Sequence, residues 1–243
     1  MVKFWNVNQK KFKNVIPVEP EKSASLAVLM GDIVGSTDSA DVASLSRAFN
    51  RVIDLENAAG TDRYASPLTI TLGDEFQGLT PSLGIGLDAM RRLSLEMRAA
   101  GIDCRFVLGV VRIETPVNEA RAWNMMGDGL AQARRKLAEK RAPSRYRFSV
   151  PAEPMMEALL DAVGRSISET EARWTQRQFE VAKRDFTLRG QQQRSPDEIA
   201  LALGVSLGGY YKVRRAARLD YLDAQWRSLE IAASALDQEL GLP

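Results

Sequence analysis

The spacing of apolar positions changes near residue 150, from alternating strand and helix patterns to helical patterns alone. Residues 26–30 form a continuous apolar run, which is typical of a central strand buried on both faces. Further strands are predicted over residues 68–72, 76–79, 104–114 and 145–150. Helical spacing predicts helices over residues 41–60, 83–99 and about 127–141, and then over 154–167 and 168–184.

The resulting order is β–α–β–β–α–β–α–β, which predicts an α+β fold class with helices packed on one mainly antiparallel sheet. A split β-α-β arrangement of this kind is the ferredoxin-like or palm-type layout. We expect this domain to span residues 25–150 and an all-α domain to span residues 151–243. Residues 1–24 are polar and basic and predict a flexible arm, for which a solvated tail is favoured over contact with an acidic partner.

A helix-turn-helix is predicted over residues 195–218. Ser195-Pro-Asp-Glu198 reads as a capping box with proline in the first turn, and Gly204-Val-Ser206 as the tight turn. The basic second helix suits contact with DNA phosphates and the major groove. A solvated basic face, balanced by Asp220 and Asp223, is the alternative. The residues expected to contact DNA are Ser206, Tyr210, Tyr211, Lys212, Arg214, Arg215 and Arg218.

Two predicted strands each stop at a Gly-Asp pair, Gly31-Asp32 and Gly73-Asp74. Two carboxylates at the ends of buried strands suggest a shared site for a hard divalent cation, Mg²⁺ or Mn²⁺. Gly35-Ser36-Thr37 follows the first pair and resembles a loop whose free N–H groups receive phosphate. Ordinary turn residues would give the same letters, and the residues alone leave the two interpretations balanced.

The composition narrows the chemistry that is available. The 243 residues include no histidine and a single cysteine, Cys104, which excludes histidine-assisted nucleophiles, histidine-bound metals and a disulfide framework within one chain. The formal charge of +2 does not by itself point to nucleic acid. No apolar run approaches the roughly 20 residues of a membrane span, and the N-terminus lacks a signal-peptide core, so we expect a cytoplasmic protein with no membrane partner.

The strings Met30-Gly-Asp-Ile-Val-Gly-Ser36 and Ile70-Thr-Leu-Gly-Asp-Glu-Phe-Gln-Gly-Leu79, together with the predicted helix-turn-helix, resemble the SatD family. The resemblance covers about residues 25–220, and the two Gly-Asp strings are its most specific part. Members of this family are often described as DNA-binding regulators. The resemblance therefore implies DNA as a partner.

The first domain also resembles class III nucleotidyl cyclases, which share a palm-type fold. The resemblance implies metal ligation by Asp32, the backbone of Ile33 and Asp74, and a catalytic role for Arg135 in steadying the transition state. Two cyclase positions differ, because Ala131 replaces an asparagine and Ile70 replaces a purine-reading lysine. Metal and triphosphate binding are thus implied, but efficient purine cyclisation is not. The expected nucleotide-binding residues are Gly35, Ser36, Thr37, Glu75 and Arg135.

Three functions follow as hypotheses. The first is a homodimeric, nucleotide-sensing, DNA-binding regulator. The second is a nucleotidyl cyclase or another phosphoryl-transfer enzyme that uses two aspartate-held metals and needs no histidine. The third is a palm-like scaffold that has lost catalysis and serves only protein interaction or dimerisation.

Overall fold

The structure is a computed structural model that describes residues 24–192 and 195–243, so the predicted basic arm lies almost entirely outside the described residues. The strands are β1 (Ala24–Ile33), β2 (Ser66–Ile70), β3 (Glu75–Thr80), β4 (Cys104–Ile113), β5 (Gly127–Asp128) and β6 (Tyr146–Ser149). The helices are α1 (Val42–Ala58), α2 (Leu83–Ala99), α3 (Leu130–Ala138), α4 (Pro154–Ala172), α5 (Gln176–Gln192), α6 (Pro196–Ala202), α7 (Leu207–Ala216) and α8 (Leu219–Glu239), with short 3-10 turns at η1 (Ser36–Asp38) and η2 (Thr61–Arg63).

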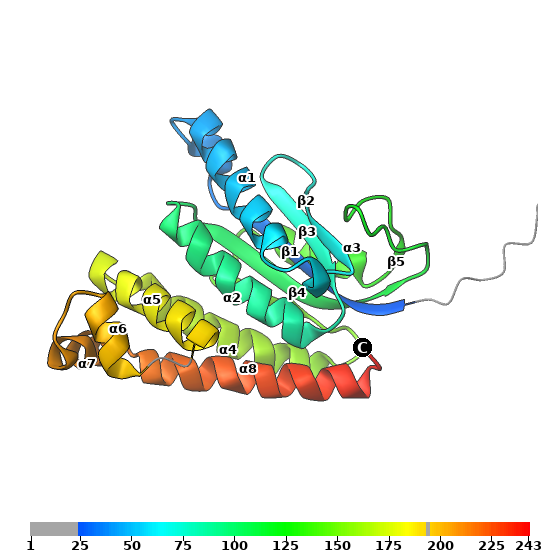
Figure 1. Cartoon of the computed structure of the whole chain (residues 1–243). Helices are drawn as coiled ribbons and strands as arrows, with labels where there is room; N and C mark the ends of the chain where they lie inside the picture. Colours follow the sequence, from blue (N-terminus) through cyan, green and yellow to red (C-terminus); the bar gives the residue numbers. More distant parts are fainter. Residues whose placement is uncertain (1–23, 193–194) are drawn as a thin grey trace, which may run out of the picture.

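The strands form one sheet in the order β2-β3-β1-β4-β5 (Figure 1). Strand β6 also pairs with β4. Strands β1 to β4 pair antiparallel throughout, whereas β6 runs parallel to β4. The antiparallel order β2-β3-β1-β4 agrees with the split β-α-β layout predicted from the sequence. It places β1 at the centre, so the ends of β1, β3 and β4 meet at one edge of the sheet.

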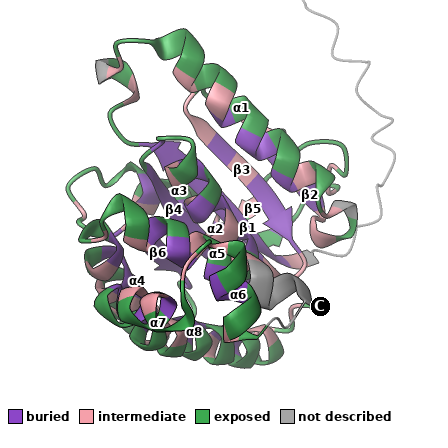
Figure 2. Ribbon diagram, turned by 60° about the vertical axis from the view of Figure 1, so that its left-hand side comes forward, coloured by how far each residue is buried: buried purple, intermediate pink, exposed green. Residues whose placement is uncertain are grey.

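Helices cover both faces of the sheet. On one face, alternate residues of the strands, such as Val28 and Val107, form a cluster with Ala133 and Leu137 of α3. On the other face, a larger cluster packs under α1 and α2 and continues into α4, α5 and α8. Figure 2 shows the buried residues concentrated in the sheet and on the inward sides of the helices. Alternation along each strand therefore decides which side chains face α3.

A row of aromatic rings runs from α1 to α8 along one face of the sheet. Successive ring centroids lie 6.1, 6.2, 6.2 and 5.1 Å apart. The rings belong, in order, to Phe49, Phe76, Phe106, Tyr146 and Trp226. Pairs at these distances stabilise beyond the area that they bury. The row ties the hairpin strand β3 to the C-terminal helix.

The helices that follow the sheet share its core. Buried residues of α4, α5 and α8, among them Leu160, Val181 and Leu229, belong to the same hydrophobic cluster as the strands. The division into domains at residues 150/151 stays a prediction, and the residues on its two sides share one hydrophobic cluster. None of the helices within residues 24–192 and 195–243 is both long enough and apolar enough to cross a membrane.

Local predictions differ from the structure mainly at element ends. Strand β1 is longer than residues 26–30, α3 is shorter than 127–141, and the two-residue strand β5 was not predicted. The division of helices at 167/168 is wrong, because α4 continues to Ala172 and the break falls before Gln176. The capping box is confirmed: the Ser195 side chain accepts from Glu198 N–H, and Glu198 accepts from Ser195 N–H.

Candidate functional site

The two predicted Gly-Asp turns meet where β1 ends and β3 begins. We call this end of the strands, with Asp32 and Asp74, the acidic edge of the sheet. Asp32 lies opposite Glu75 in the pairing of β1 with β3, and Asp74 immediately precedes Glu75. The Ile33 N–H donates to the Asp74 carbonyl at 3.0 Å, and the Ser36 hydroxyl donates to the Asp74 carboxylate at 2.5 Å. The structure therefore brings Asp32, Ile33, Ser36, Asp74 and Glu75 together, as the sequence analysis expected.

The two glycines serve different purposes. Gly31 lies within β1, where a Cβ atom would overlap the ring of Phe76 on the neighbouring strand. Gly73 has a φ of 83°, a left-handed conformation that the hairpin turn requires and that favours glycine. One glycine thus allows close packing behind the acidic pair, and the other allows the turn that presents Asp74.

An arginine that was not predicted from the sequence lies beside the acidic edge. Arg105 of β4 lies opposite Asp32, and its Nε is 3.1 Å from the Asp32 carboxylate. The N–H is not directed at that oxygen, so the buried Nε of Arg105 has an ion-pair partner but no hydrogen bond to any described residue. The guanidinium is thus only partly satisfied by Asp32.

The environment of Asp32 disfavours its charge. Burial raises the pKa of the Asp32 carboxyl above its ordinary value. Arg105 opposes this effect and lowers that pKa, while the nearby carboxylates of Asp74 and Glu75 raise it further. A cation that binds this carboxylate would replace the water that Asp32 loses on burial.

Further basic side chains border the site on the side of α3. Arg147 of β6 is buried and donates to the backbone carbonyls of Leu137 and Glu139 at the end of α3, while its Nε lacks a hydrogen-bond partner among the described residues. Burial, followed by the charge of Arg105, lowers the pKa of Arg147. Arg134 donates to the Gln77 side chain at 2.8 Å. The signal in the sequence was the charge of Arg105 and Arg147 within strands that are largely apolar.

The donor set suits a hard cation whose shell is shared with phosphate. Asp32 and Asp74 supply two carboxylates, and no group of three or more His, Cys, Asp or Glu side chains gathers to hold a metal within residues 24–192 and 195–243. Mg²⁺ usually keeps several waters and takes one or two protein carboxylates together with substrate phosphates. The residues therefore fit a phosphate-bridged cation better than a metal enclosed by protein.

The other predicted nucleotide-binding residues, Gly35, Thr37 and Arg135, make none of the contacts described above. Gly35 has a left-handed φ of 69° before the turn η1, and both Gly35 and Thr37 are exposed. Arg135 lines a separate surface hollow with Ser149 and Glu157, beside the start of α4. Of these two neighbouring arginines of α3, Arg134 contacts β3 near the acidic edge, through Gln77, whereas Arg135 does not.

The predicted DNA-binding helix exists as α7, following α6 and a turn in which Gly204 has a φ of 65°. Ser206 begins α7 as its N-cap, accepting from Gly209 N–H at 3.1 Å. The remaining exposed side chains of the predicted set are Tyr211, Lys212, Arg215 and Arg218.

Two residues of that set must be corrected. Tyr210 is buried and donates its hydroxyl proton to Asp185 of α5. Arg214 is 4% exposed and forms ion pairs with Asp185, with Asp220 at 2.8 Å and with Asp223 at 2.6 Å. Both side chains face the protein because α7 turns that side towards α5 and α8. In this structure neither reaches solvent to contact DNA.

A model of the SatD family matches residues 26–193, which is more than half of the chain. The chain therefore belongs to the SatD family. The match covers the sheet, except for the first two residues of β1, and all of α4 and α5, and it ends before α6, α7 and α8. No curated protein matches the chain in sequence.

Solved structures similar to this one include two of a bacterial light-regulated adenylyl cyclase, which are 16% and 19% identical with TM-scores of 0.41 and 0.39. In both, 56% of this chain is covered, and the chain spans 45% of the length of the cyclase chain. The guanylyl cyclase Cya2 is 13% identical, with a TM-score of 0.33 and with 46% of this chain and 68% of that chain covered. At such scores these similarities carry no argument about the activity of this chain.

Proposed function

We propose that this protein is a DNA-binding regulator that senses a nucleotide through a divalent cation at the acidic edge of the sheet. The observation that carries the proposal is the convergence of Asp32 and Asp74 at the paired ends of β1 and β3. The two carboxylates would hold Mg²⁺ or Mn²⁺, assisted by the backbone of Ile33, and the cation would neutralise phosphate charge.

Arg105 gives the site two alternative charge arrangements. Without a cation, its guanidinium lies against Asp32. When a cation takes the Asp32 carboxylate, Arg105 loses that counter-charge and becomes a partner for a phosphate oxygen. Ser36 already donates to Asp74 and keeps that carboxylate in place. Binding of a metal-bound nucleotide would therefore change the contacts of the Arg105 side chain on β4 as well as those of the two aspartates.

The raised pKa of Asp32 makes binding depend on pH. A cation binds the ionised carboxylate, so binding should weaken as the pH falls, starting above the ordinary aspartate pKa of 3.8. The carboxyl resonance of Asp32 in an NMR titration checks this expectation. We expect its midpoint above 3.8 in the free protein and a lower midpoint with Mg²⁺ and nucleotide. A midpoint at or below 3.8 in the free protein would contradict the account.

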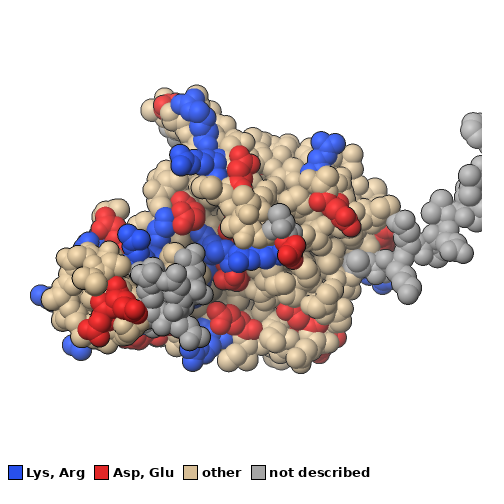
Figure 3. All heavy atoms as spheres, viewed as in Figure 1, with Lys and Arg blue, Asp and Glu red and all other residues tan. Residues whose placement is uncertain are grey.

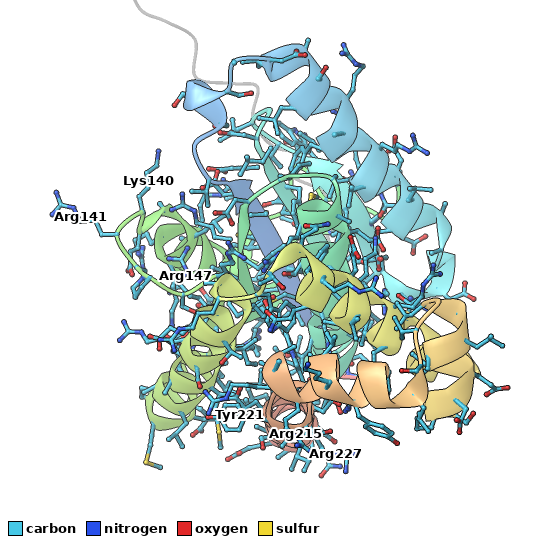
Figure 4. The ribbon with its side chains drawn as sticks, turned by 90° about the vertical axis from the view of Figure 1, so that its left-hand side faces the viewer. Lys140, Arg141, Arg147, Arg215, Tyr221 and Arg227 are labelled. Atoms are coloured by element: carbon cyan, nitrogen blue, oxygen red, sulfur yellow. The ribbon has the colours of Figure 1, made fainter. Side chains whose placement is uncertain are left out.

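The DNA-binding element of the proposal is α7. Its exposed side chains Tyr211, Lys212 and Arg215 suit groove and phosphate contacts. Figure 4 shows Arg215 and Arg227 at the lower surface of the molecule, away from Lys140 and Arg141. On the face drawn in Figure 3, acidic and basic side chains are interspersed, so DNA contact would rest on a local surface. A homodimer would place two such helices on two half-sites.

The experiment is to measure binding of genomic DNA fragments by wild type and by Arg215→Ala, with and without Mg²⁺ and each nucleoside triphosphate. We expect Arg215→Ala to weaken DNA binding and to reduce its dependence on salt by about one unit of log–log slope. We also expect nucleotide to change the affinity of the wild type. Unchanged affinity in Arg215→Ala would reject α7 as the DNA-binding element.

The acidic pair also supports a phosphoryl-transfer enzyme as a second candidate. Two aspartate-held cations can activate a hydroxyl and stabilise leaving pyrophosphate without histidine. The place of Arg135, outside the acidic edge of its own chain, is the reason that we rank catalysis second. Release of pyrophosphate from a triphosphate that disappears in Asp74→Ala would reverse this order.

A further inference from the structure

We propose that a notch at the junction of α7 and α8 holds a phosphate of the DNA backbone. The inference rests on the proposed function, because it assumes that α7 docks on DNA. The notch has a volume of about 210 Å³ and lies where α4, α5 and the α7–α8 junction meet. It differs from the acidic edge of the sheet in both position and charge.

The notch is lined by two arginines that are available to an anion. Arg173 follows the end of α4 and Arg218 precedes the start of α8, and both are exposed. Neither is ion-paired with any residue in the part of the chain that the structure describes. Arg214, four residues before Arg218, is instead saturated by three carboxylates. Planar guanidinium groups with free N–H donors suit phosphate oxygens.

Neighbouring groups hold the notch in shape. The Trp174 indole N–H donates to the Ala217 carbonyl at 2.9 Å, which fixes the α7–α8 junction against the connection between α4 and α5. The Arg218 guanidinium lies 5.4 Å from the centre of the Tyr221 ring. The Tyr221 hydroxyl lies 3.4 Å from the Ser166 hydroxyl of α4, within hydrogen-bond distance. The notch therefore combines two cations with hydroxyl groups that can also donate to phosphate.

The backbone of Arg218 supports a role for its side chain. Arg218 has a φ of 57° and a ψ of 36°, in the left-handed region that favours glycine. A residue with a side chain is disfavoured there unless the surroundings hold it. The position would accept glycine without strain, so the variant Arg218→Gly removes the guanidinium and leaves the backbone conformation available.

The notch lies at the end of the proposed DNA-binding helix. Helix α7 ends at Ala216, two residues before Arg218, and Arg215 in its last turn is exposed. Figure 4 shows Arg215 and Tyr221 at the same lower surface of the molecule. A helix placed in the major groove has backbone phosphates beside it, and contacts to these phosphates fix its register without reading sequence. The geometry therefore points to a DNA phosphodiester as the occupant.

One carboxylate in the notch would repel a bound phosphate, and its removal tests the assignment. Glu169 of α4 also lines the notch, so the two guanidiniums face a single acidic group. Removing that charge should strengthen DNA binding if the notch holds phosphate, and a merely structural role would not do so. We expect Glu169→Gln to raise DNA affinity by about two- to fivefold.

The test measures DNA affinity of the full chain as a function of salt for Arg218→Gly, Arg173→Gln and Glu169→Gln. We expect each arginine variant to lose about five- to tenfold in affinity and about 0.9 in log–log salt slope, for all DNA sequences alike. Arg51→Ala, which removes an exposed arginine of α1 outside the notch, is the matched control and should change neither quantity. Circular dichroism of each variant checks that it is folded.

Three other outcomes would contradict the proposal, each in a different way. Unchanged affinity in both arginine variants, with a loss in Arg215→Ala, would reject the notch and leave the DNA-binding function intact. No DNA binding by wild type would reject both the DNA-binding function and the notch. Stabilisation of wild type by inorganic phosphate that disappears in Arg218→Gly, with unchanged DNA affinity, would assign the notch to free phosphate and reject the DNA assignment.

Discussion

Replacing Arg214 with alanine is expected to lower the free energy of unfolding by about 3–5 kcal/mol. The guanidinium is buried and pairs with Asp185, Asp220 and Asp223 from two neighbouring helices. Removing it would leave the buried Asp185 carboxylate without its arginine partner. The carboxylates of Asp185, Asp220 and Asp223 would then repel one another with no arginine between them. Urea unfolding followed by circular dichroism measures the loss. Arg215→Ala, one residue away and exposed, is the matched control and should change stability by less than about 0.5 kcal/mol.

The same pair of variants separates structure from DNA contact. We expect Arg214→Ala to affect DNA binding only in proportion to its loss of folded protein, whereas Arg215→Ala should weaken DNA binding while remaining folded. A stable Arg214→Ala variant with strongly reduced DNA affinity would show that this side chain leaves its carboxylate partners to bind DNA. The assignment of Arg214 to the interior would then be wrong.

Asp74→Asn is expected to weaken Mg²⁺-dependent nucleotide binding by at least about a hundredfold. Loss of an outer partner of a metal ligand already costs about ten- to a hundredfold in affinity, and Asp74 is proposed as a direct ligand. The amide keeps the size of the side chain and can still accept from the Ser36 hydroxyl, so the fold should be preserved. Calorimetric titration of both proteins with and without Mg²⁺ measures the difference.

Asp128→Asn is the matched control for that measurement. Asp128 also follows a glycine, but it lies exposed in β5, at the other end of β4 from Arg105. We expect its removal to leave nucleotide binding unchanged. Equal binding by wild type, Asp74→Asn and Asp128→Asn would mean that the nucleotide binds elsewhere.

The periodicity of apolar residues was sufficient to predict most of the fold. Helix α2 has the predicted bounds, Leu83–Ala99, because a regular apolar stripe ends at Gly101, which has a φ of 75°. The hairpin around Gly73 was predictable for the same kind of local reason, a turn that requires positive φ. The break between α4 and α5 was not, since no proline or glycine marks Arg173 to Thr175.

The acidic pair was predictable in part, because two strands that end in Gly-Asp become neighbours once the strand order is inferred. The places of Arg105 and Arg147 were not predictable. Arg105 lies beside Asp32 because β1 pairs with β4, and Arg147 reaches the end of α3 because β6 pairs with β4 under the face that α3 covers. A charged residue in an apolar strand indicates a buried partner, but not which one.

The buried side of α7 was the main error in the site prediction. The sequence pointed to Asp220 and Asp223 as residues that balance the basic helix, and Arg214 does pair with both. What the sequence could not supply was Asp185, 29 residues earlier on α5, which turns this face of α7 towards the protein. Residues of one helix that look alike in sequence, such as Arg214 and Arg215, therefore have opposite environments.

The central claim is that the acidic edge of the sheet binds a nucleotide through a divalent cation. The most direct measurement is calorimetric titration of the wild-type protein with ATP, GTP, CTP and UTP, each with and without Mg²⁺. We predict saturable binding of at least one nucleotide that requires the cation. Absence of binding by all four in the presence of Mg²⁺ would contradict the claim and favour a palm-like fold that serves only as a scaffold.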